Sequence, residues 1–229
     1  MKRTTQSIRV LGVRGFLAVV AALCSIAVAQ AVPAPLGPGG FVFPPPLGVN
    51  PTGTLLASTT APFLSATLNG TLISRVYSGD ATSPLAGLTF TYQIILSPSS
   101  PNAVSQLAVS RFGSFLTDVS YYGLETTINP TNISPSFISR SSEGGGVGDV
   151  MQFHFGPPGA TESLFPGNTS SLLIVQTSAP NFQATTASII DGVAVPNIAS
   201  LAPLTIPEPS TVVLGVAGLV GFAIARRKK

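Results

Sequence analysis

The chain has 229 residues and a formal net charge of +3. Eight of its 11 Lys and Arg residues lie in the first 14 and the last four positions, so the positive balance belongs to the two ends. Residues 32–205 contain three arginines, seven carboxylates and no lysine, which gives this segment a net charge of −4. Because nucleic-acid binding depends on clustered Lys and Arg, this composition excludes nucleic acid as a partner.

Residues 1–31 have the pattern of a secretory signal peptide. A basic start precedes an apolar run over residues 15–28, and its charges come from Lys2, Arg3, Arg9 and Arg14. Ala29 and Ala31 both fit the small-residue rule for cleavage by signal peptidase, and the sequence does not choose between them. The single cysteine, Cys24, lies in the apolar run. We therefore expect an exported mature chain with no disulfide and no thiolate metal site.

Residues 32–52 are predicted to be a spacer. The segment is rich in proline and glycine, a composition that disfavours both helices and sheet ladders and favours an extended arm. Phe41 and Phe43 are the side chains through which part of this arm can dock on a neighbouring domain.

Residues 53–200 predict a single antiparallel β-sandwich, jelly-roll-like, in an all-β fold. Turn residues recur every eight to 12 positions, and the clearest strand, 88–96, alternates large apolar side chains with Thr and Gln. Leu88, Phe90, Tyr92, Ile94 and Leu96 are expected to face the core. The other expected strands are 53–58, 66–77, 104–112, 118–122, 137–140, 150–155, 171–177 and 187–195. Residues 201–206 are then a linker; from a last strand ending near Val195, roughly ten residues reach at most about 35 Å.

Residues 207–229 combine three features in a fixed order. A Pro-Glu-Pro entry stops a helix from extending backwards, an apolar run follows over 211–225, and the chain ends in four cations. Fifteen helical residues span roughly 22 Å, less than the hydrocarbon core of a bilayer, but a terminal basic cluster is typical of the cytoplasmic end of a membrane helix. We therefore predict a transmembrane helix over 211–225, with a stop-transfer tail of Arg226, Arg227, Lys228 and Lys229.

This C-terminal arrangement resembles the PEP-CTERM sorting signal of exported bacterial proteins. The resemblance lies in the motif Pro207, Glu208 and Pro209, the apolar helix and the basic end. It implies that an integral-membrane exosortase recognises the motif and removes the helix as the protein leaves the membrane. The family is typical of Gram-negative bacteria that make exopolysaccharide, which makes exopolysaccharide a candidate partner.

No pattern in the sequence predicts a catalytic, cofactor-binding or metal site. The single histidine, His154, is expected to point outward with Gln152 from a strand whose Phe153 and Phe155 face inward. One histidine without a second convergent ligand does not make a metal site. The glycine-rich loop between Glu143 and Asp149 lacks the lysine and helix of a phosphate-binding loop and the spacing of a calcium loop.

The sequence thus predicts a non-enzymatic cell-surface or extracellular-matrix protein, associated with exopolysaccharide or biofilm. Its expected partners during export are signal peptidase, an exosortase and the membrane, which holds it transiently through the C-terminal helix. Three alternatives stay open: a carbohydrate-binding or adhesive sandwich, marked by exposed aromatic residues on a sheet; a hydrolase of surface polymers; and a permanently anchored single-span protein.

Overall fold

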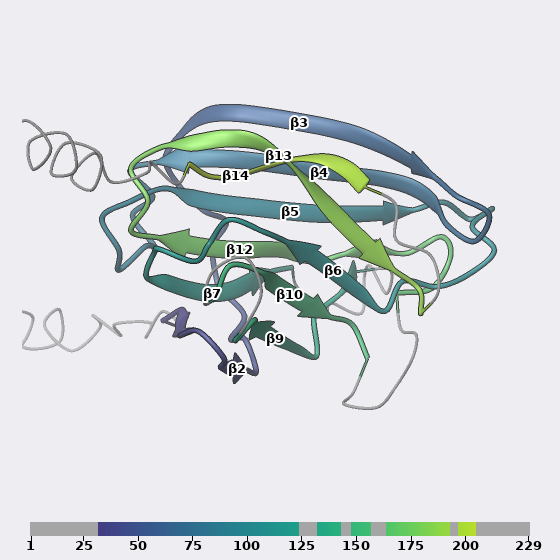
Figure 1. The fold of residues 1–229 in the computed structure, drawn as a ribbon, viewed down its shortest axis with the longest axis horizontal. Coiled ribbons are helices and arrows are strands. Elements are labelled where there is room, and N and C mark those ends of the chain that lie inside the picture. Colours follow the sequence, from purple (N-terminus) through teal and green to yellow (C-terminus); the bar gives the residue numbers. More distant parts are fainter. Residues whose placement is uncertain (1–31, 124–131, 143–147, 157–163, 193–196, 205–229) are drawn as a thin grey trace, which may run out of the picture. The chain divides into compact units, whose positions relative to one another are not determined.

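The computed structural model describes residues 32–123, 132–142, 148–156, 164–192 and 197–204. These residues form fourteen strands in an all-β fold with two sheets (Figure 1). The strands are Ala34–Pro35 (β1), Phe41–Val42 (β2), Thr54–Leu64 (β3), Asn69–Ser78 (β4), Thr89–Leu96 (β5), Gln106–Val109 (β6), Thr117–Tyr122 (β7), Asn132–Ile133 (β8), Phe137–Arg140 (β9), Met151–His154 (β10), Thr169–Ser170 (β11), Leu172–Thr177 (β12), Phe182–Ile190 (β13) and Asn197–Pro203 (β14).

The first sheet has eight strands and curls into a half-barrel. Its main path is β3-β4-β5-β12-β7-β1, and the short β11 pairs with both β5 and β8. The pairing of β11 with β8 is parallel, which corrects the expectation of a purely antiparallel sheet. A two-residue strand such as β8 makes no periodic pattern in the sequence, so its direction was not predictable.

The second sheet has six strands in the order β14-β13-β6-β10-β9-β2, and all its pairs are antiparallel. Strands β6, β9 and β10 alternate buried residues with half-buried ones. The buried side chains, including Leu107, Ile138 and Phe153, join the core. The half-buried ones therefore lie on the opposite face of this sheet.

The main core lies between the two sheets. Phe90, Tyr92, Ile94 and Leu96 of β5 are all buried in it, together with Leu88, which confirms the inward face expected for this segment. Tyr92 packs at 6.1 Å from Phe153 of the second sheet, measured between ring centroids. Its hydroxyl donates to the carbonyl of Leu201 in β14 at 2.8 Å, so the buried polar atom of this ring is satisfied.

The outer face of the first sheet is also covered. Ile174 and Leu172 of β12 pack with Leu47, which comes from the proline-rich N-terminal segment, in a second apolar cluster. Beside that cluster, Thr89, Thr91, Ser120 and Gln176 are almost fully buried although their side chains are polar. This sheet is therefore buried on both faces where β5, β7 and β12 run side by side.

Asp80 is the centre of the polar part of that covered face. Its carboxylate accepts hydrogen bonds from two backbone amides, Thr52 N at 3.1 Å and Thr82 N at 3.0 Å. It also accepts bonds from the side chains of Thr82, Thr89 and Gln176. One buried carboxylate thus ties the chain before β3 and the loop after β4 to the strands β5 and β12.

Strands also occur beyond both ends of the range predicted for the sandwich. Residues of the predicted spacer form β1 and β2, which pair with β7 and β9. At the other end, β14 runs to Pro203, which corrects the expected end of the last strand near Val195. The backbone of Leu201 is fixed from the facing sheet, by Ser74 Oγ at 3.1 Å and by the Tyr92 hydroxyl. Contacts of this kind join residues far apart in sequence, so periodicity does not reveal them.

Candidate functional site

The residues that the sequence assigns to export and sorting lie outside the described part of the chain. They are Ala29, Ala31, Pro207, Glu208, Pro209, Arg226, Arg227, Lys228 and Lys229. Within the described ranges, no helix is long and apolar enough to cross a membrane. In the same ranges, no group of three or more His, Cys, Asp or Glu side chains is placed to hold a metal ion.

The strongest candidate site is a cluster of rings on the outer face of the second sheet, which we call the aromatic face. We define it as Phe41, Phe43, Phe137, Ser139, Gln152 and His154. In the register of the sheet, Phe137 lies opposite His154 and Ser139 lies opposite Gln152. Phe41 of β2 lies opposite Ser139 on the other side of β9. The three strands are grouped at the lower end of the view in Figure 1.

The aromatic face is made of rings in direct contact. Phe137 and His154 stack almost in parallel, with centroids 4.0 Å apart and an interplanar angle of 7°. Phe41 packs nearly perpendicular to Phe137 and to Phe43, with ring centroids 6.4 Å and 6.1 Å apart. Phe41 is 63% exposed and Phe43 is 68% exposed. Two large apolar rings in contact with each other and with solvent are unusual, because most such rings are buried in soluble domains.

Polar groups lie beside these rings. The Ser139 hydroxyl donates to Gln152 Oε1 at 3.0 Å and lies 3.1 Å from His154 Nε2. A hydroxyl has one proton to donate, so Nε2 of His154 is the donor toward Ser139 Oγ. Burial against the sheet lowers the pKa of His154, and the imidazole is therefore neutral near pH 7.

This geometry does not activate Ser139 as a nucleophile. An activating histidine must accept the serine proton, whereas here the serine proton goes to Gln152. Among the described residues, no carboxylate is hydrogen-bonded to His154 to orient the ring. The arrangement offers instead a stacking surface with an amide, a hydroxyl and an imidazole at its side, which is the chemistry of a binding site.

Sequence reasoning found part of this site. Residues 137–140 and 150–155 were expected to be strands, and the structure places β9 and β10 there, with His154 and Gln152 on the outward side. It did not predict that Phe137, Phe41 and Phe43 are in contact. The relevant signal in the sequence is the pair Phe41 and Phe43, the two aromatic residues of the proline-rich segment 32–52. This pair indicates that the segment can dock on the domain, but it does not indicate which strand it contacts.

The described fold and its aromatic face define an all-β protein with an exposed cluster of aromatic rings. Comparison with known families indicates where the protein is sorted. Residues 205–229 match the family model of the PEP-CTERM protein-sorting motif. The chain therefore carries a PEP-CTERM sorting motif at its C-terminus, which implies an exported protein that an exosortase processes. Proteins with this motif are sorted to the cell surface. No curated protein and no solved structure matches the chain.

Proposed function

We propose that this protein is a non-enzymatic surface protein whose sandwich binds extracellular polysaccharide through the aromatic face. Export begins with signal peptidase cleavage after Ala29 or Ala31. The apolar segment 211–225 then holds the chain in the membrane until an exosortase removes it at the motif Pro207, Glu208 and Pro209. The released sandwich remains with the exopolysaccharide or biofilm outside the cell.

The observation that supports polysaccharide binding is the exposure of Phe41 and Phe43 beside Phe137 and His154. The flat face of an aromatic ring carries negative charge density, and it attracts the weakly positive C–H groups on one side of a sugar ring. Sugar hydroxyls also need hydrogen-bond partners, and Ser139, Gln152 and His154 provide a donor or an acceptor each. A neutral face of this kind suits a neutral or weakly charged glycan.

The test uses the protein expressed from the full gene and recovered from the envelope or medium of the host. Co-sedimentation with the host's purified exopolysaccharide measures binding of the natural sequence and of the double variant Phe41→Ala, Phe137→Ala. We expect the double variant to lose binding by about thirtyfold or more, because a single aromatic anchor contributes about 2 kcal/mol at a binding site.

A matched control is Phe165→Ala. Phe165 is 55% exposed, comparable with the 63% of Phe41, but it lies outside the aromatic face. We expect it to bind like the natural sequence. Equal losses in both variants would show that exposed phenylalanines adsorb the polysaccharide non-specifically. No loss in the double variant would reject the aromatic face as the binding site.

The sorting part of the proposal has its own test. Intact mass of the protein from envelope and medium is compared between the natural motif and a variant with Pro207→Ala, Glu208→Ala and Pro209→Ala. We expect a released species that lacks the apolar segment only when the motif is intact. A full-length membrane species in both cases would favour a permanently anchored single-span protein, and it would leave the polysaccharide test unaffected.

We also propose that the sandwich is a modified jelly roll. With the short β8 and β11 set aside, the runs β5-β12-β7 and β13-β6-β10 follow the pairing order of a jelly roll. A regular jelly roll would also pair β4 with β13 and β9 with β7. Here β4 pairs with β5 and β9 pairs with β10, which are their neighbours in sequence. A crystal structure of the secreted protein in which β12 or β6 has a different partner would overturn this assignment.

A further inference from the structure

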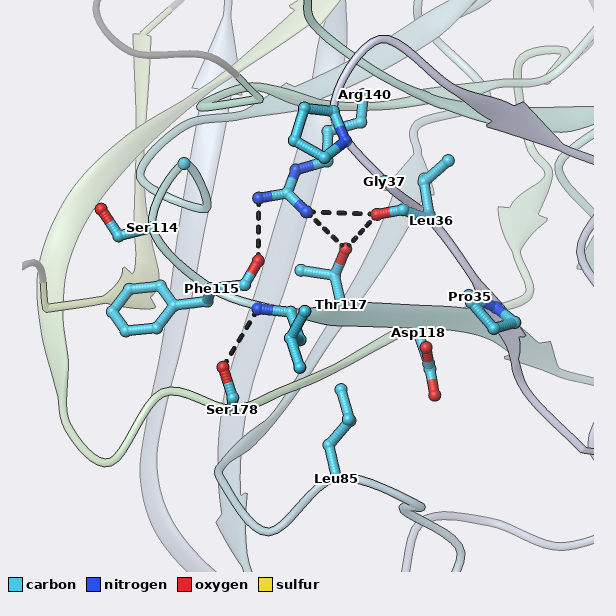
Figure 2. Close-up of a pocket in the computed structure, with 13 residues that line it drawn as sticks. Pro35, Leu36, Gly37, Leu85, Ser114, Phe115, Thr117, Asp118, Arg140 and Ser178 are labelled. Carbon is cyan, nitrogen blue, oxygen red and sulfur yellow. Dashed lines mark hydrogen bonds between the residues drawn. The ribbon is translucent and has the colours of Figure 1, made fainter.

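A pocket of about 660 Å³ lies at the start of β7, and none of its lining residues belongs to the aromatic face (Figure 2). Its walls come from the segment around β1, the loop that leads into β7, and single residues of other segments. Most of these walls are apolar, with Pro35, Leu36, Leu85, Phe115 and Leu116 among them. The volume falls in the range of roughly 300–1,000 Å³ that small-molecule sites have.

One of the two charged groups in the wall, Arg140, has no capacity left for a ligand. Its five N–H groups donate to Gly148 O, Leu36 O, Thr117 Oγ1, Phe112 O and Phe115 O. A guanidinium has five N–H donors in total, so all of them are used within the protein. Arg140 therefore holds the loop before β7 against β1, and it cannot bind an anion by hydrogen bonds without breaking these contacts.

The other charged group, Asp118, is open. It is 8% exposed, and its carboxylate has no hydrogen bond or ion pair with any of the described residues. Figure 2 shows its side chain on the opposite side of β7 from Arg140, toward Leu85. Burial raises the pKa of this carboxyl, as expected for a group that lost water and gained no donor. A carboxylate that receives no donor from the protein leaves its acceptor sites for water or a ligand in the pocket.

The strand beside Asp118 supplies a second open acceptor. Gln176 of β12 is its direct partner in the sheet. Its Nε2 donates to Asp80 and Thr82, but its Oε1 is buried and has no partner among the described residues. Two neighbouring acceptors thus lack donors among the described residues. Gln176 is fully buried and is not part of the pocket wall, so Asp118 is the acceptor that a ligand in the pocket can reach.

We propose that this pocket binds a compound that carries a primary ammonium on an unbranched apolar stem. The ammonium donates to the Asp118 carboxylate, and the stem lies against Leu85 and Pro35. An ammonium has three donors and a positive charge, which matches one carboxylate with unfilled acceptor sites. A divalent metal ion fits less well, because it needs several oxygen ligands and Asp118 is the single carboxylate in this wall. The proposal does not rest on polysaccharide binding.

Such an ammonium occurs in free alkylamines and in lysine side chains, so the experiment uses both. Isothermal titration calorimetry measures hexylammonium, hexan-1-ol and Nα-acetyl-lysine-N-methylamide against the protein expressed from the full gene. We expect saturable binding of at least one of the two ammonium compounds, and binding of hexan-1-ol at least roughly tenfold weaker because it lacks the charge. Binding of hexylammonium alone assigns the site to free amines, and binding of the lysine derivative assigns it to lysine side chains.

Three variants make the test specific. Asp118→Asn keeps the shape but removes the charge, and we expect it to reduce ammonium affinity roughly tenfold or more. Leu85→Trp keeps the carboxylate but narrows the pocket, and it is also expected to weaken binding. Asp149→Asn removes a carboxylate outside the pocket and should bind normally. Absence of ammonium binding in the natural sequence, or equal affinity in Asp118→Asn, would overturn the proposal.

Discussion

The outer faces of the two sheets differ in polarity, and the exposed face is the more apolar one. On the second sheet, the open face carries Phe41 and Phe43, two large apolar rings in contact with solvent. On the first sheet, the covered face buries Thr89, Thr91 and Gln176, which are polar. Folding stability alone favours the opposite arrangement, because apolar groups gain free energy on burial and polar groups lose it unless they are hydrogen-bonded.

The covered face is stable because it has a hydrogen-bonding centre. Asp80 accepts five hydrogen bonds there, from backbone and side chains of four segments. The open face has no comparable centre among the described residues, and its rings contact each other rather than the core. The difference indicates that the covered face serves the fold, whereas the open face is available for a partner.

Substitution of Asp80 tests the covered face and should have the largest effect. Asp80→Ala leaves the side-chain donors of Thr89 and Gln176 buried without their acceptor, so we expect a loss of about 3 kcal/mol in the free energy of unfolding. Urea denaturation followed by circular dichroism measures it. Asp149→Ala removes a carboxylate that accepts one hydrogen bond, from Arg111 N, and attracts the Arg140 guanidinium, so it should cost less, about 1 kcal/mol. Similar losses in both variants would contradict a central role for Asp80.

Thr91 allows a smaller test with the opposite sign. Its Oγ1 is buried and has no hydrogen-bond partner among the described residues. Thr91→Val replaces this hydroxyl by a methyl group of similar shape, so we expect stability to rise by about 1 kcal/mol. The same denaturation experiment measures the change. A clear loss of stability would show that the hydroxyl has a hydrogen-bond partner, such as a buried water molecule.

The sequence predicted one of these two faces better than the other. Alternation in 150–155 places Gln152 and His154 outward, because Met151 and Phe153 are large and apolar and therefore go to the core. The same rule identifies the inner face of β5 but does not show that Thr89 and Thr91 opposite are buried. Asp80 bonds to Thr89, and Leu47 packs on the neighbouring strand β12; both reach this face from distant parts of the chain. Local patterns predict strands and their inward sides, and they do not contain the contacts that cover a second face.

The pH dependence of the aromatic face is the smallest effect and uses the single histidine. Burial lowers the pKa of His154 below its usual value near 6.5, so the unfolded chain takes up a proton at a higher pH than the folded protein does. The stability from this residue is fully present above about pH 6.5 and is lost as the pH falls through the pKa of the folded state. We expect the natural sequence to lose more stability between pH 7 and pH 5 than His154→Gln does.

Proton NMR gives a direct reading, because the chain contains one imidazole and its signals need no assignment among several histidines. We expect a titration midpoint below 6.5 in the natural sequence. The variant Phe137→Ala removes the ring that stacks on His154 at 4.0 Å and returns water to the imidazole, so its midpoint should move up toward 6.5. A midpoint at or above 6.5 in the natural sequence would mean that water reaches the imidazole. It would then contradict the stacking of Phe137 on His154 in the aromatic face.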